Sequence, residues 1–409
     1  MAPTPPGAAP DSPLRAVFIA NGDPRDLKTW SGTPRHMLEA LEKRVDMRLV
    51  VRSLWPRWYR PLGRALKLLS GRRFEYSWSG WYSGLAGRRT IRQLRAARPD
   101  VVFAVALTDM AYLFAEELPV VYITDAVIPD LLEYYEMFQR ISDTAKRRAL
   151  QAERDAFEAA LLLHFPSAWA VRSAIEKQKV SPHRVVEIAW GANMPFQARP
   201  ERALSAGPLQ LLFVGTHWDR KGGPIALDAA AELARRGIDS RLDIVGCTAE
   251  VATGPVPANV TFHGFVNKGT EAGRILLDRL YADANFFILP TLAEAYGIVF
   301  AEAAHHGLPS LAYATGGVTS VVRDGETGIL LPLGSSGADI ADQVEALAQS
   351  PERYARMSGA ALADARDRLN WDIWADRLEA AVRERLQQAG EHKRAPRAVP
   401  PLEVKGVSQ

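Results

Sequence analysis

Two glutamates, Glu294 and Glu302, stand with seven residues between them where an apolar run gives way to a helix-like pattern. Pro290 and Thr291 end the apolar run, and Gly307 closes the helical one. Ligands of open α/β sheets bind beyond the carboxyl ends of strands, where a helix N-terminus offers free N–H groups to an anion such as a diphosphate. Carboxylates repel phosphate, so we expect this pair to accept hydrogen bonds from sugar hydroxyls of a nucleotide sugar.

A second polar segment supplies the cations that a diphosphate needs. It runs from Phe213 to Gly223 after another predicted strand and contains Gly215, Arg220 and Lys221. Glycine permits close backbone approach, and the two cations would lie at the carboxyl edge of the sheet. The alternative is an ordinary solvated loop before a helix.

The composition restricts the protein class. The chain has 409 residues, 50 basic against 47 acidic ones, and 47% apolar residues, which is ordinary for a globular protein of two domains or more. The near-zero net charge gives no reason to expect nucleic-acid binding. Cys247 is the single cysteine, which excludes an intramolecular disulfide and a cysteine-rich metal site.

Short apolar strands alternate with helical segments in two series, which predicts two α/β domains with parallel sheets facing each other across a cleft. We expect a disordered start at 1–13, a first domain at 14–190, a linker at 191–208, a second domain at 209–370, a last helix within 371–389 that packs on either domain, and a disordered tail at 390–409. The predicted strands are Ala16–Ala20, Arg48–Val51, Val101–Val105, Val120–Ile123, Leu162–Phe165 and Val185–Ile188, then Leu209–Val214, Leu242–Val245, Val260–Phe262, Phe286–Leu289, Ser310–Tyr313 and Ile329–Leu331. The predicted helices include Pro34–Lys43, Asp109–Glu116, one long segment Leu131–Ala160, Ala168–Lys179 and Ile373–Gln388.

The second half of the chain resembles the donor-binding half of the retaining GT-B glycosyltransferases of family GT4. The resemblance is carried by Glu294–Glu302 with Gly307-Leu-Pro309, by Arg220-Lys221-Gly222, and by Gly316-Gly317 through Asp324-Gly325 and Gly328. It implies that Glu294 binds hydroxyls of the donor sugar and Glu302 those of the ribose. It further implies that Arg220 and Lys221 neutralise the leaving diphosphate. Many members place the arginine directly after the glycine of the first strand, where this chain has Thr216. The implied donor-binding residues are Gly32, Thr33, Gly215, Arg220, Lys221, Glu294, Ala295, Tyr296, Gly297, Ile298, Val299 and Glu302.

The first domain resembles the acceptor half less specifically. Gly32 and Thr33 lie between the first strand and a helix, as the family's glycine loop does, which would bring them near the donor phosphates. Thr33 capping a helix begun by Pro34 is a compatible alternative.

Asp125 ends a strand at a position where many relatives have a histidine near the donor sugar. A carboxylate there binds a sugar hydroxyl or helps take the acceptor proton, but an aspartate after a strand is equally often a helix cap. Asp109 is a weaker candidate.

We expect no metal and no cofactor other than the nucleotide-sugar donor. His305 and His306 are adjacent, so their side chains diverge on a helix, and neither has a ligand partner at i+4. The chain has no Asp-x-Asp motif.

Residues 52–98 carry twelve Lys or Arg against one acidic residue, Glu75, with aromatic residues between them. This composition favours an anionic membrane surface, and an ordinary solvated face is the alternative. The single cysteine fits a reducing compartment, so we expect a cytoplasmic protein, and this segment adds the expectation that it is peripheral at the inner face of the plasma membrane.

The activity that this pattern predicts is transfer of a sugar, with retention, from a UDP- or GDP-sugar to a saccharide or lipid-linked acceptor in polysaccharide or glycolipid biosynthesis. A non-hydrolysing nucleotide-sugar epimerase and a catalytically silent sugar-nucleotide binder are the alternatives. A dinucleotide-dependent dehydrogenase is excluded, because neither domain has a Gly-x-Gly-x-x-Gly turn after its first strand.

Overall fold

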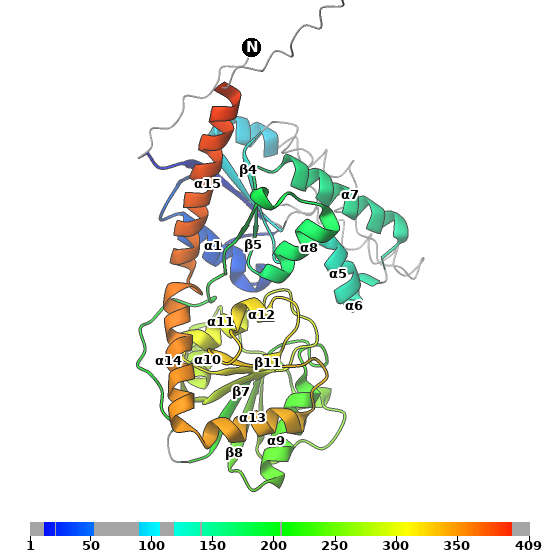
Figure 1. Cartoon of the computed structure of the whole chain (residues 1–409), viewed down its shortest axis with the longest axis vertical. Coiled ribbons are helices and arrows are strands. Elements are labelled where there is room, and N and C mark those ends of the chain that lie inside the picture. Colours follow the sequence, from blue (N-terminus) through cyan, green and yellow to red (C-terminus); the bar gives the residue numbers. More distant parts are fainter. Residues whose placement is uncertain are drawn as a thin grey trace, which may run out of the picture.

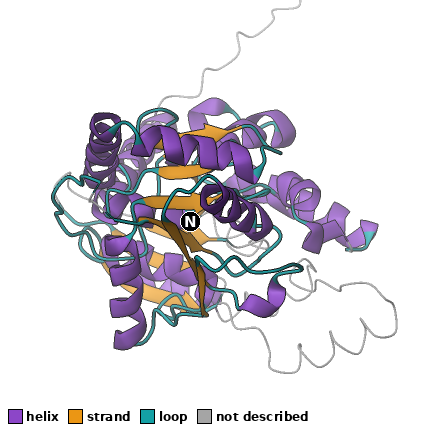
Figure 2. Ribbon diagram, turned by 90° about the horizontal axis from the view of Figure 1, so that it is seen from below, coloured by secondary structure: helices purple, strands orange, loops and turns teal. Residues whose placement is uncertain are grey.

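The chain folds into two α/β domains stacked along the long axis of the molecule (Figure 1). The computed structural model describes residues 12–20, 22–52, 90–106, 118–139, 141–204 and 207–394. Each domain contains a six-stranded parallel sheet, and helices lie on either side of the strands (Figure 2). The predicted fold class is confirmed.

The first sheet has the strand order β2-β1-β3-β4-β5-β6. Its middle strands β1, β3 and β4 are almost wholly buried, which is why they read as continuous apolar runs rather than as alternating ones. The strands are β1 Arg15–Ala20, β2 Asp46–Arg52, β3 Val101–Val105, β4 Val120–Ile123, β5 Leu162–Phe165 and β6 Val185–Glu187.

The second sheet has the order β12-β11-β10-β7-β8-β9. The chain crosses from one half of this sheet to the other between the neighbours β7 and β10, so their carboxyl ends form the topological switch point where ligands of such sheets bind. The strands are β7 Leu209–Val214, β8 Ser240–Val245, β9 Val260–Gly264, β10 Phe286–Leu289, β11 Ser310–Tyr313 and β12 Gly328–Leu331. All twelve predicted strands are confirmed to within two residues.

The helices of the first domain differ from the prediction in one important place. The single helix predicted over Leu131–Ala160 is wrong: the chain leaves helical geometry at Tyr135, with φ −113° and ψ 118°, forms one short helix, and starts a third helix at Asp143. The side chain of Ser142 accepts a hydrogen bond from Ala145 N at 3.3 Å, so a serine cap begins that new helix. The elements are η1 Thr29–Gly32, α1 Thr33–Leu41, α5 Ile128–Tyr134, α6 Glu136–Gln139, α7 Asp143–Ala159, α8 Ala168–Gln178 and η3 Pro182–Arg184. The predicted helix Asp109–Glu116 lies outside the described residues.

The second domain ends in two long helices that extend over both domains (Figure 1). Its elements are α9 Gly223–Arg235, η4 Ala249–Val251, α10 Glu271–Asp283, α11 Ile298–His305, α12 Val318–Val321, α13 Gly337–Ala348, α14 Pro351–Asp367 and α15 Trp371–Arg394. The last helix predicted over Ile373–Gln388 is too short at both ends, because α15 runs from Trp371 to Arg394. The tail predicted to be disordered from residue 390 is therefore helical up to Arg394. Helix α15 packs on the first domain beside α1, where Lys43 and Arg44 form ion pairs with Asp372 and Asp376 at 2.8 and 2.7 Å.

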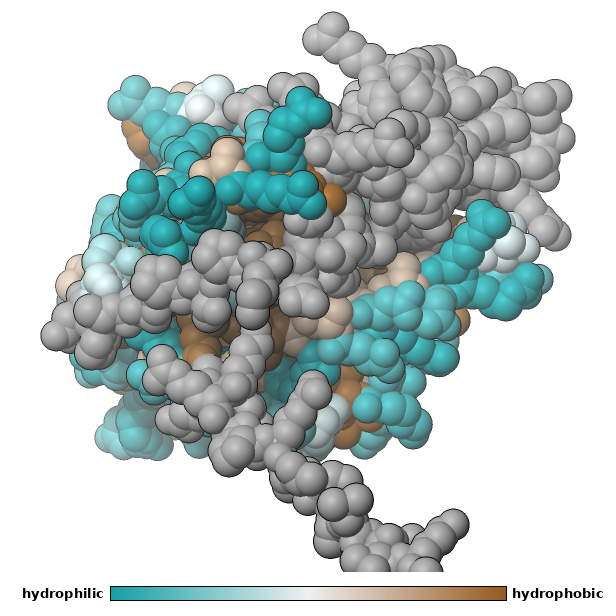
Figure 3. Space-filling view, turned by 90° about the horizontal axis from the view of Figure 1, so that it is seen from above, coloured by the Kyte–Doolittle hydropathy of each residue, from teal (hydrophilic) through white to brown (hydrophobic). Residues whose placement is uncertain are grey.

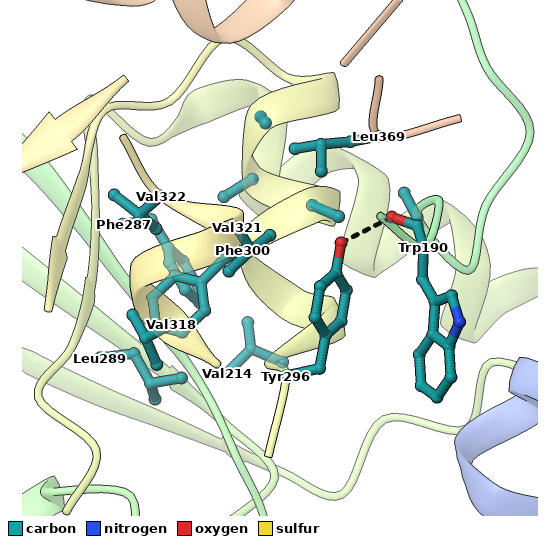
Figure 4. Close-up of a cluster of buried hydrophobic side chains, with 14 of the residues drawn as sticks. Trp190, Val214, Phe287, Leu289, Tyr296, Phe300, Val318, Val321, Val322 and Leu369 are labelled. Atoms are coloured by element: carbon teal, nitrogen blue, oxygen red, sulfur yellow. Dashed lines mark hydrogen bonds between the residues drawn. The ribbon is translucent and has the colours of Figure 1, made fainter. Parts of the chain in front are cut away.

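Aromatic side chains join the two domains around Trp190. Its ring meets Trp30 and Tyr296 edge-on at centroid distances of 5.3 and 5.5 Å, and Trp371 lies at 6.3 Å. The Tyr296 hydroxyl donates to the Trp190 carbonyl oxygen at 2.9 Å (Figure 4). One apolar core runs through this junction without interruption, so the domains are held in a defined orientation rather than tethered by a free linker.

The described surface seen from above is largely hydrophilic, with hydrophobic residues mostly in recesses (Figure 3). No described helix combines the length and the apolar character needed to cross a bilayer. Residues 53–89, most of the basic aromatic segment, lie outside the described residues, so its predicted membrane contact stays a prediction.

The junction yields a stability prediction at Gly191. A Cβ there would lie 2.4 Å from the backbone nitrogen of Trp371, so Gly191→Ala has to push the interdomain contact apart. We expect a loss of about 1–3 kcal/mol in the free energy of unfolding, measured by urea denaturation. Gly254→Ala is the matched control, because a Cβ at Gly254 meets nothing within 4 Å. Equal stability of the two variants would contradict the close contact.

Candidate functional site

The loops that follow β7 and β10 are locked together at the switch point of the second sheet. Leu292 N donates to the carbonyl oxygen of Arg220 at 2.8 Å, and the Thr291 hydroxyl donates to the same oxygen at 3.2 Å. Gly222 crosses so close that a Cβ on it would lie 2.1 Å from the Pro290 carbonyl oxygen. This crossing therefore requires glycine, and it brings the cationic loop beside the acidic one.

A glycine pair after β11 holds the other side of the acidic loop. Gly317 N donates to the Glu294 carbonyl oxygen at 3.0 Å. A Cβ on Gly316 would lie 2.1 Å from that oxygen, and one on Gly317 would lie 2.0 Å from the Ala295 carbonyl oxygen. The glycine-rich turn singled out in the sequence thus fixes the backbone on which Glu294 stands.

The predicted charges converge where these loops meet. The Lys221 ammonium contacts the Glu294 carboxylate, and both side chains are only 12% exposed. Arg220 Nη1 lies 3.9 Å from the same carboxylate and donates to Ala293 O at 2.6 Å. Gly215 packs under the lysine stem, because a Cβ there would lie 3.0 Å from Lys221 Cγ. Two cations and one carboxylate therefore lie side by side. The cations can bind a diphosphate and the carboxylate can accept hydrogen bonds from hydroxyls of the same ligand.

Two tyrosines of the first domain reach across to this loop. Glu294 N donates to Tyr134 Oη at 3.1 Å, and Ala295 N donates to Tyr135 Oη at 2.9 Å. The Arg220 guanidinium lies 5.4 Å from the centre of the Tyr135 ring. Burial raises the pKa of Tyr135, so its phenol keeps the proton.

Neither tyrosine was predicted from the sequence, because an unbroken helix would have placed neighbouring residues on diverging faces. The break at Tyr135 lets the two point to one loop. The serine cap at Ser142 was the available signal for a second helix start.

Gly297 begins helix α11 in the left-handed region, with φ +93°. A Cβ there would lie 2.6 Å from the Phe300 ring, so the turn is reserved for glycine. Ile298 and Val299 are the first helical residues, at the end where N–H groups lack intrahelical partners. The Tyr296 side chain points the other way, into the junction with Trp190 (Figure 4).

Glu302 lies one helical turn further on and is fully buried. Its carboxylate contacts Lys268 Nζ at 2.5 Å and accepts from the Tyr281 hydroxyl at 3.1 Å. Burial lowers the pKa of His36 in α1 of the first domain, and the carboxylates of Glu39 and, to a smaller extent, Glu302 oppose that effect. Lys268 was not predicted from the sequence, although its place shortly after the end of β9, at the carboxyl edge of the sheet, was a usable signal.

The loop before α1 is tied to the interdomain linker. Gly32, not Thr33, caps the helix, with φ +84°, so the predicted threonine cap is wrong. The Thr33 hydroxyl instead accepts from Asn193 Nδ2 at 3.0 Å, and the same nitrogen donates to Ser31 O at 2.9 Å. The Thr33 side chain therefore binds the linker and holds the loop in place. The predicted contact of Thr33 with the donor phosphates would have to be made by its backbone N–H.

A cavity of about 390 Å³ lies between β4, α5 and the acidic loop of the second domain. Asp125 and Ala295 both line it, so it connects the predicted acceptor-side carboxylate with the donor-side loop. Burial raises the pKa of Asp125 to about 7, and the nearby Glu294 carboxylate adds to the shift. Glu153 also lines the cavity, and burial raises its pKa to about 8. Asp109 lies outside the described residues.

The two adjacent histidines bind separate partners. His305 Nε2 contacts Leu369 O at 2.9 Å, whereas His306 Nε2 contacts Asp278 Oδ1 at 2.9 Å and its ring stacks on Tyr281. Within the described ranges, no three His, Cys, Asp or Glu side chains come together as a metal site.

Comparisons with known proteins agree with this geometry. Residues 208–350 match the family model described as Glycosyl transferases group 1. The D-inositol 3-phosphate glycosyltransferase of Corynebacterium aurimucosum is 30% identical over 259 residues, which are 58% of this chain and 61% of that protein. The chain therefore spans less than two thirds of that relative's length.

Solved structures with the GT-B arrangement of two domains match almost the whole chain. HepE from Anabaena, in complex with UDP and glucose, has a TM-score of 0.60 at 17% identity, covering 94% of this chain and 100% of its own. Sucrose-phosphate synthase from Thermosynechococcus elongatus has a TM-score of 0.65 at 15% identity, covering 91% and 99%. At these identities the likeness shows the GT-B fold alone.

The buried Glu302 supports a double-variant experiment. Lys268→Met leaves the carboxylate without its cation, and we expect it to lower the free energy of unfolding by about 1–3 kcal/mol, since the lysine is one-third exposed. Glu302→Gln added to Lys268→Met should recover part of that loss, because an amide oxygen still accepts from Tyr281. Urea denaturation of both variants measures this, and a double variant no more stable than Lys268→Met would contradict the pairing.

Proposed function

We propose that this chain transfers a sugar from a nucleoside-diphosphate sugar to an acceptor held mainly by the first domain, because residues 208–350 match the family model of the group 1 glycosyl transferases. The observation that carries the proposal is the meeting of Arg220, Lys221 and Glu294 at the switch point of the second sheet, facing the first domain. A simple anion would not need a carboxylate there, and a dinucleotide is disfavoured because neither domain has a Gly-x-Gly-x-x-Gly turn after its first strand. A nucleotide sugar needs both signs of charge, because it carries a diphosphate and hydroxyls.

In the proposed complex each side chain has a separate task. Arg220 and Lys221 neutralise the diphosphate as negative charge builds on it, which is the largest electrostatic demand of the reaction. Glu294 accepts hydrogen bonds from donor-sugar hydroxyls, and Glu302 from the ribose once Lys268 yields one carboxylate oxygen. The N–H groups of Ala295 to Val299 bind donor oxygens in place of the tyrosine phenol at Ala295, and Gly32 lies near the diphosphate from the other domain.

The transfer itself exchanges one bond at the anomeric carbon for another. The acceptor oxygen bonds to this carbon on the face from which the diphosphate departs, so configuration is retained. The bond from the carbon to the phosphate oxygen breaks with its electron pair leaving on the nucleoside diphosphate. A phosphate oxygen of the leaving group takes the acceptor's proton, and no metal takes part in the proposed step.

Asp125 is the acceptor-side residue of this proposal. Its carboxylate lies near Glu294 and borders the cavity next to Ala295, which is where an acceptor hydroxyl meets the donor sugar. The ionised carboxylate can accept the hydroxyl's hydrogen bond at either oxygen, whereas in the protonated form one oxygen carries a hydrogen and acts as a donor.

The donor of first choice is UDP-glucose, because a structure of the same fold binds UDP and glucose. GDP-sugars are the second group of donors to be tested. We place the reaction in polysaccharide or glycolipid synthesis in the cytoplasm, peripheral to the inner membrane face through residues 52–98.

Removing the charge of Glu294 should stop transfer. We expect Glu294→Gln to lower kcat at least 100-fold, about 2.7 kcal/mol of transition-state stabilisation, while the variant still folds and unfolds cooperatively at a lowered melting temperature, because Lys221 loses its anion. The measurement is nucleoside diphosphate release with the donor that gives the largest thermal shift in a panel of UDP- and GDP-sugars. Glu326→Gln, at an exposed carboxylate of the same domain, is the control. Normal turnover in Glu294→Gln rejects the assignment.

Donor alone tests the alternatives in the same assay. Conversion of the sugar without any acceptor would identify an epimerase. Donor binding without turnover on any acceptor would identify a silent binder.

The raised pKa of Asp125 predicts the pH dependence of the reaction. A carboxyl with a pKa of about 7 is mostly protonated below that pH, so kcat/KM for the acceptor should rise through pH 7 and level off above it. Asp125→Asn should remove this rise and lower the plateau at least 10-fold, with the thermal shift by donor retained. An unchanged pH profile in Asp125→Asn would show that another group titrates.

A further inference from the structure

The cavity beside Asp125 has walls that are mainly carbon. Helix α5, the helix break and α6 contribute Ile128, Leu131, Tyr135 and Phe138, while Trp30 and Tyr122 close it from the sheet side. Ala295 is its single described contribution from the second domain, directly beside Glu294. A ligand in this cavity therefore has an apolar environment up to the point where the donor sugar is proposed to lie.

Three polar side chains on the described walls form hydrogen bonds within the protein, namely those of Thr124, Glu153 and Tyr135. The Thr124 hydroxyl donates to Ala126 O at 3.1 Å. Both carboxylate oxygens of Glu153 lie 2.9 Å from Ile128 N, and one of them also accepts from Gln178. The Tyr135 oxygen accepts from Ala295 N. Among the described residues, no side chain is a hydrogen-bond partner of the Asp125 carboxylate.

These walls distinguish between two kinds of acceptor. A free sugar or an inositol carries hydroxyls on every side, and each one buried against carbon loses its water without gaining a partner. An aryl or alkyl group loses nothing there and gains from leaving water. The Asp125 carboxylate, at the end of the cavity next to the donor site, can accept a hydrogen bond from one hydroxyl of such a ligand.

We propose that the acceptor carries an apolar group, aryl or alkyl, directly beside the hydroxyl that receives the sugar, and that this cavity binds that group. The inference rests on the proposed function and narrows its acceptor from a saccharide or lipid-linked molecule to a hydrophobic alcohol. Leu131 and Phe138 pack against the apolar group of the acceptor. Asp125 binds the acceptor hydroxyl at the end of the cavity that Ala295 lines.

The wild-type test compares hydrophobic and polar acceptors. Benzyl alcohol and 1-octanol are the apolar probes, and glucose and myo-inositol are polar ones of similar size. With the donor chosen by thermal shift, we expect kcat/KM at least 10-fold higher for one of the apolar alcohols than for either polar probe. Preference for benzyl alcohol indicates an aryl source, and preference for 1-octanol a hydrocarbon chain. Equal or better transfer to glucose or inositol overturns the inference.

Two leucines of α5 make a matched pair of variants. Leu131 lines the cavity, whereas Leu132, its neighbour in the same apolar cluster, does not. Leu131→Gln should raise KM for the preferred alcohol at least 10-fold while the melting-temperature shift by donor stays unchanged, and Leu132→Gln should behave as wild type towards the alcohol. Equal effects of the two variants on KM overturn the proposal for this cavity.

The melting-temperature shift caused by the donor distinguishes failure of the acceptor inference from failure of the proposed function. Donor binding without transfer to either apolar alcohol overturns this inference and leaves the proposed function standing. A wild-type chain that no nucleotide sugar stabilises overturns the proposed function, and the acceptor inference falls with it.

Discussion

The close crossing of the loops after β7, β10 and β11 is the constraint on which the site depends. Gly222 lies against the Pro290 carbonyl, and Gly316 and Gly317 lie against the carbonyls of Glu294 and Ala295, at distances that no side chain tolerates. Backbone hydrogen bonds between the loops then set the register of the crossing. Because of this interlock, Lys221 reaches Glu294 although 73 positions separate them in the chain. Any backbone shift at the crossing would pull cation and carboxylate apart.

A second dependence runs between the domains. The aromatic cluster around Trp190 and the paired helices α1 and α15 hold the first domain against the second, and only in that arrangement do Tyr134 and Tyr135 reach the acidic loop. The tyrosine phenols donate and accept as ligand hydroxyls do, so they satisfy the same N–H groups that a donor sugar would use. The cavity beside them is likewise a product of both domains, since Asp125 and Ala295 come from different ones. The contacts at the site therefore depend on the relative orientation of the two domains.

Prediction from sequence succeeded where local pattern and chain topology are enough. Parallel strands buried on both faces must be short apolar runs, so strands such as Val101–Val105 and Ser310–Tyr313 were readable without a structure. Arg220, Lys221 and Glu294 could be grouped because they follow strands at one sheet edge. Helix continuity failed as a guide over Leu131–Ala160, where the propensity of most residues is helical, and the residue at the break, Tyr135, contacts the other domain. Lys268 was missed for a related reason, since its partner Glu302 lies 34 residues away on another element.

The sequence by itself determined the class of fold, the two-domain division and the residue types at the switch point, because these follow from hydrophobic periodicity, glycine placement and charge spacing along the chain. Only the tertiary structure decided which groups share a contact: Glu302 with Lys268, Thr33 with Asn193 rather than with its own helix, and the tyrosines with the loop at Glu294. It also decided the apolar character of the cavity at Asp125. The physical reason is that burial and partner choice depend on side chains from distant segments and from both domains. Local pattern specifies which face a residue takes, and packing specifies what it meets there.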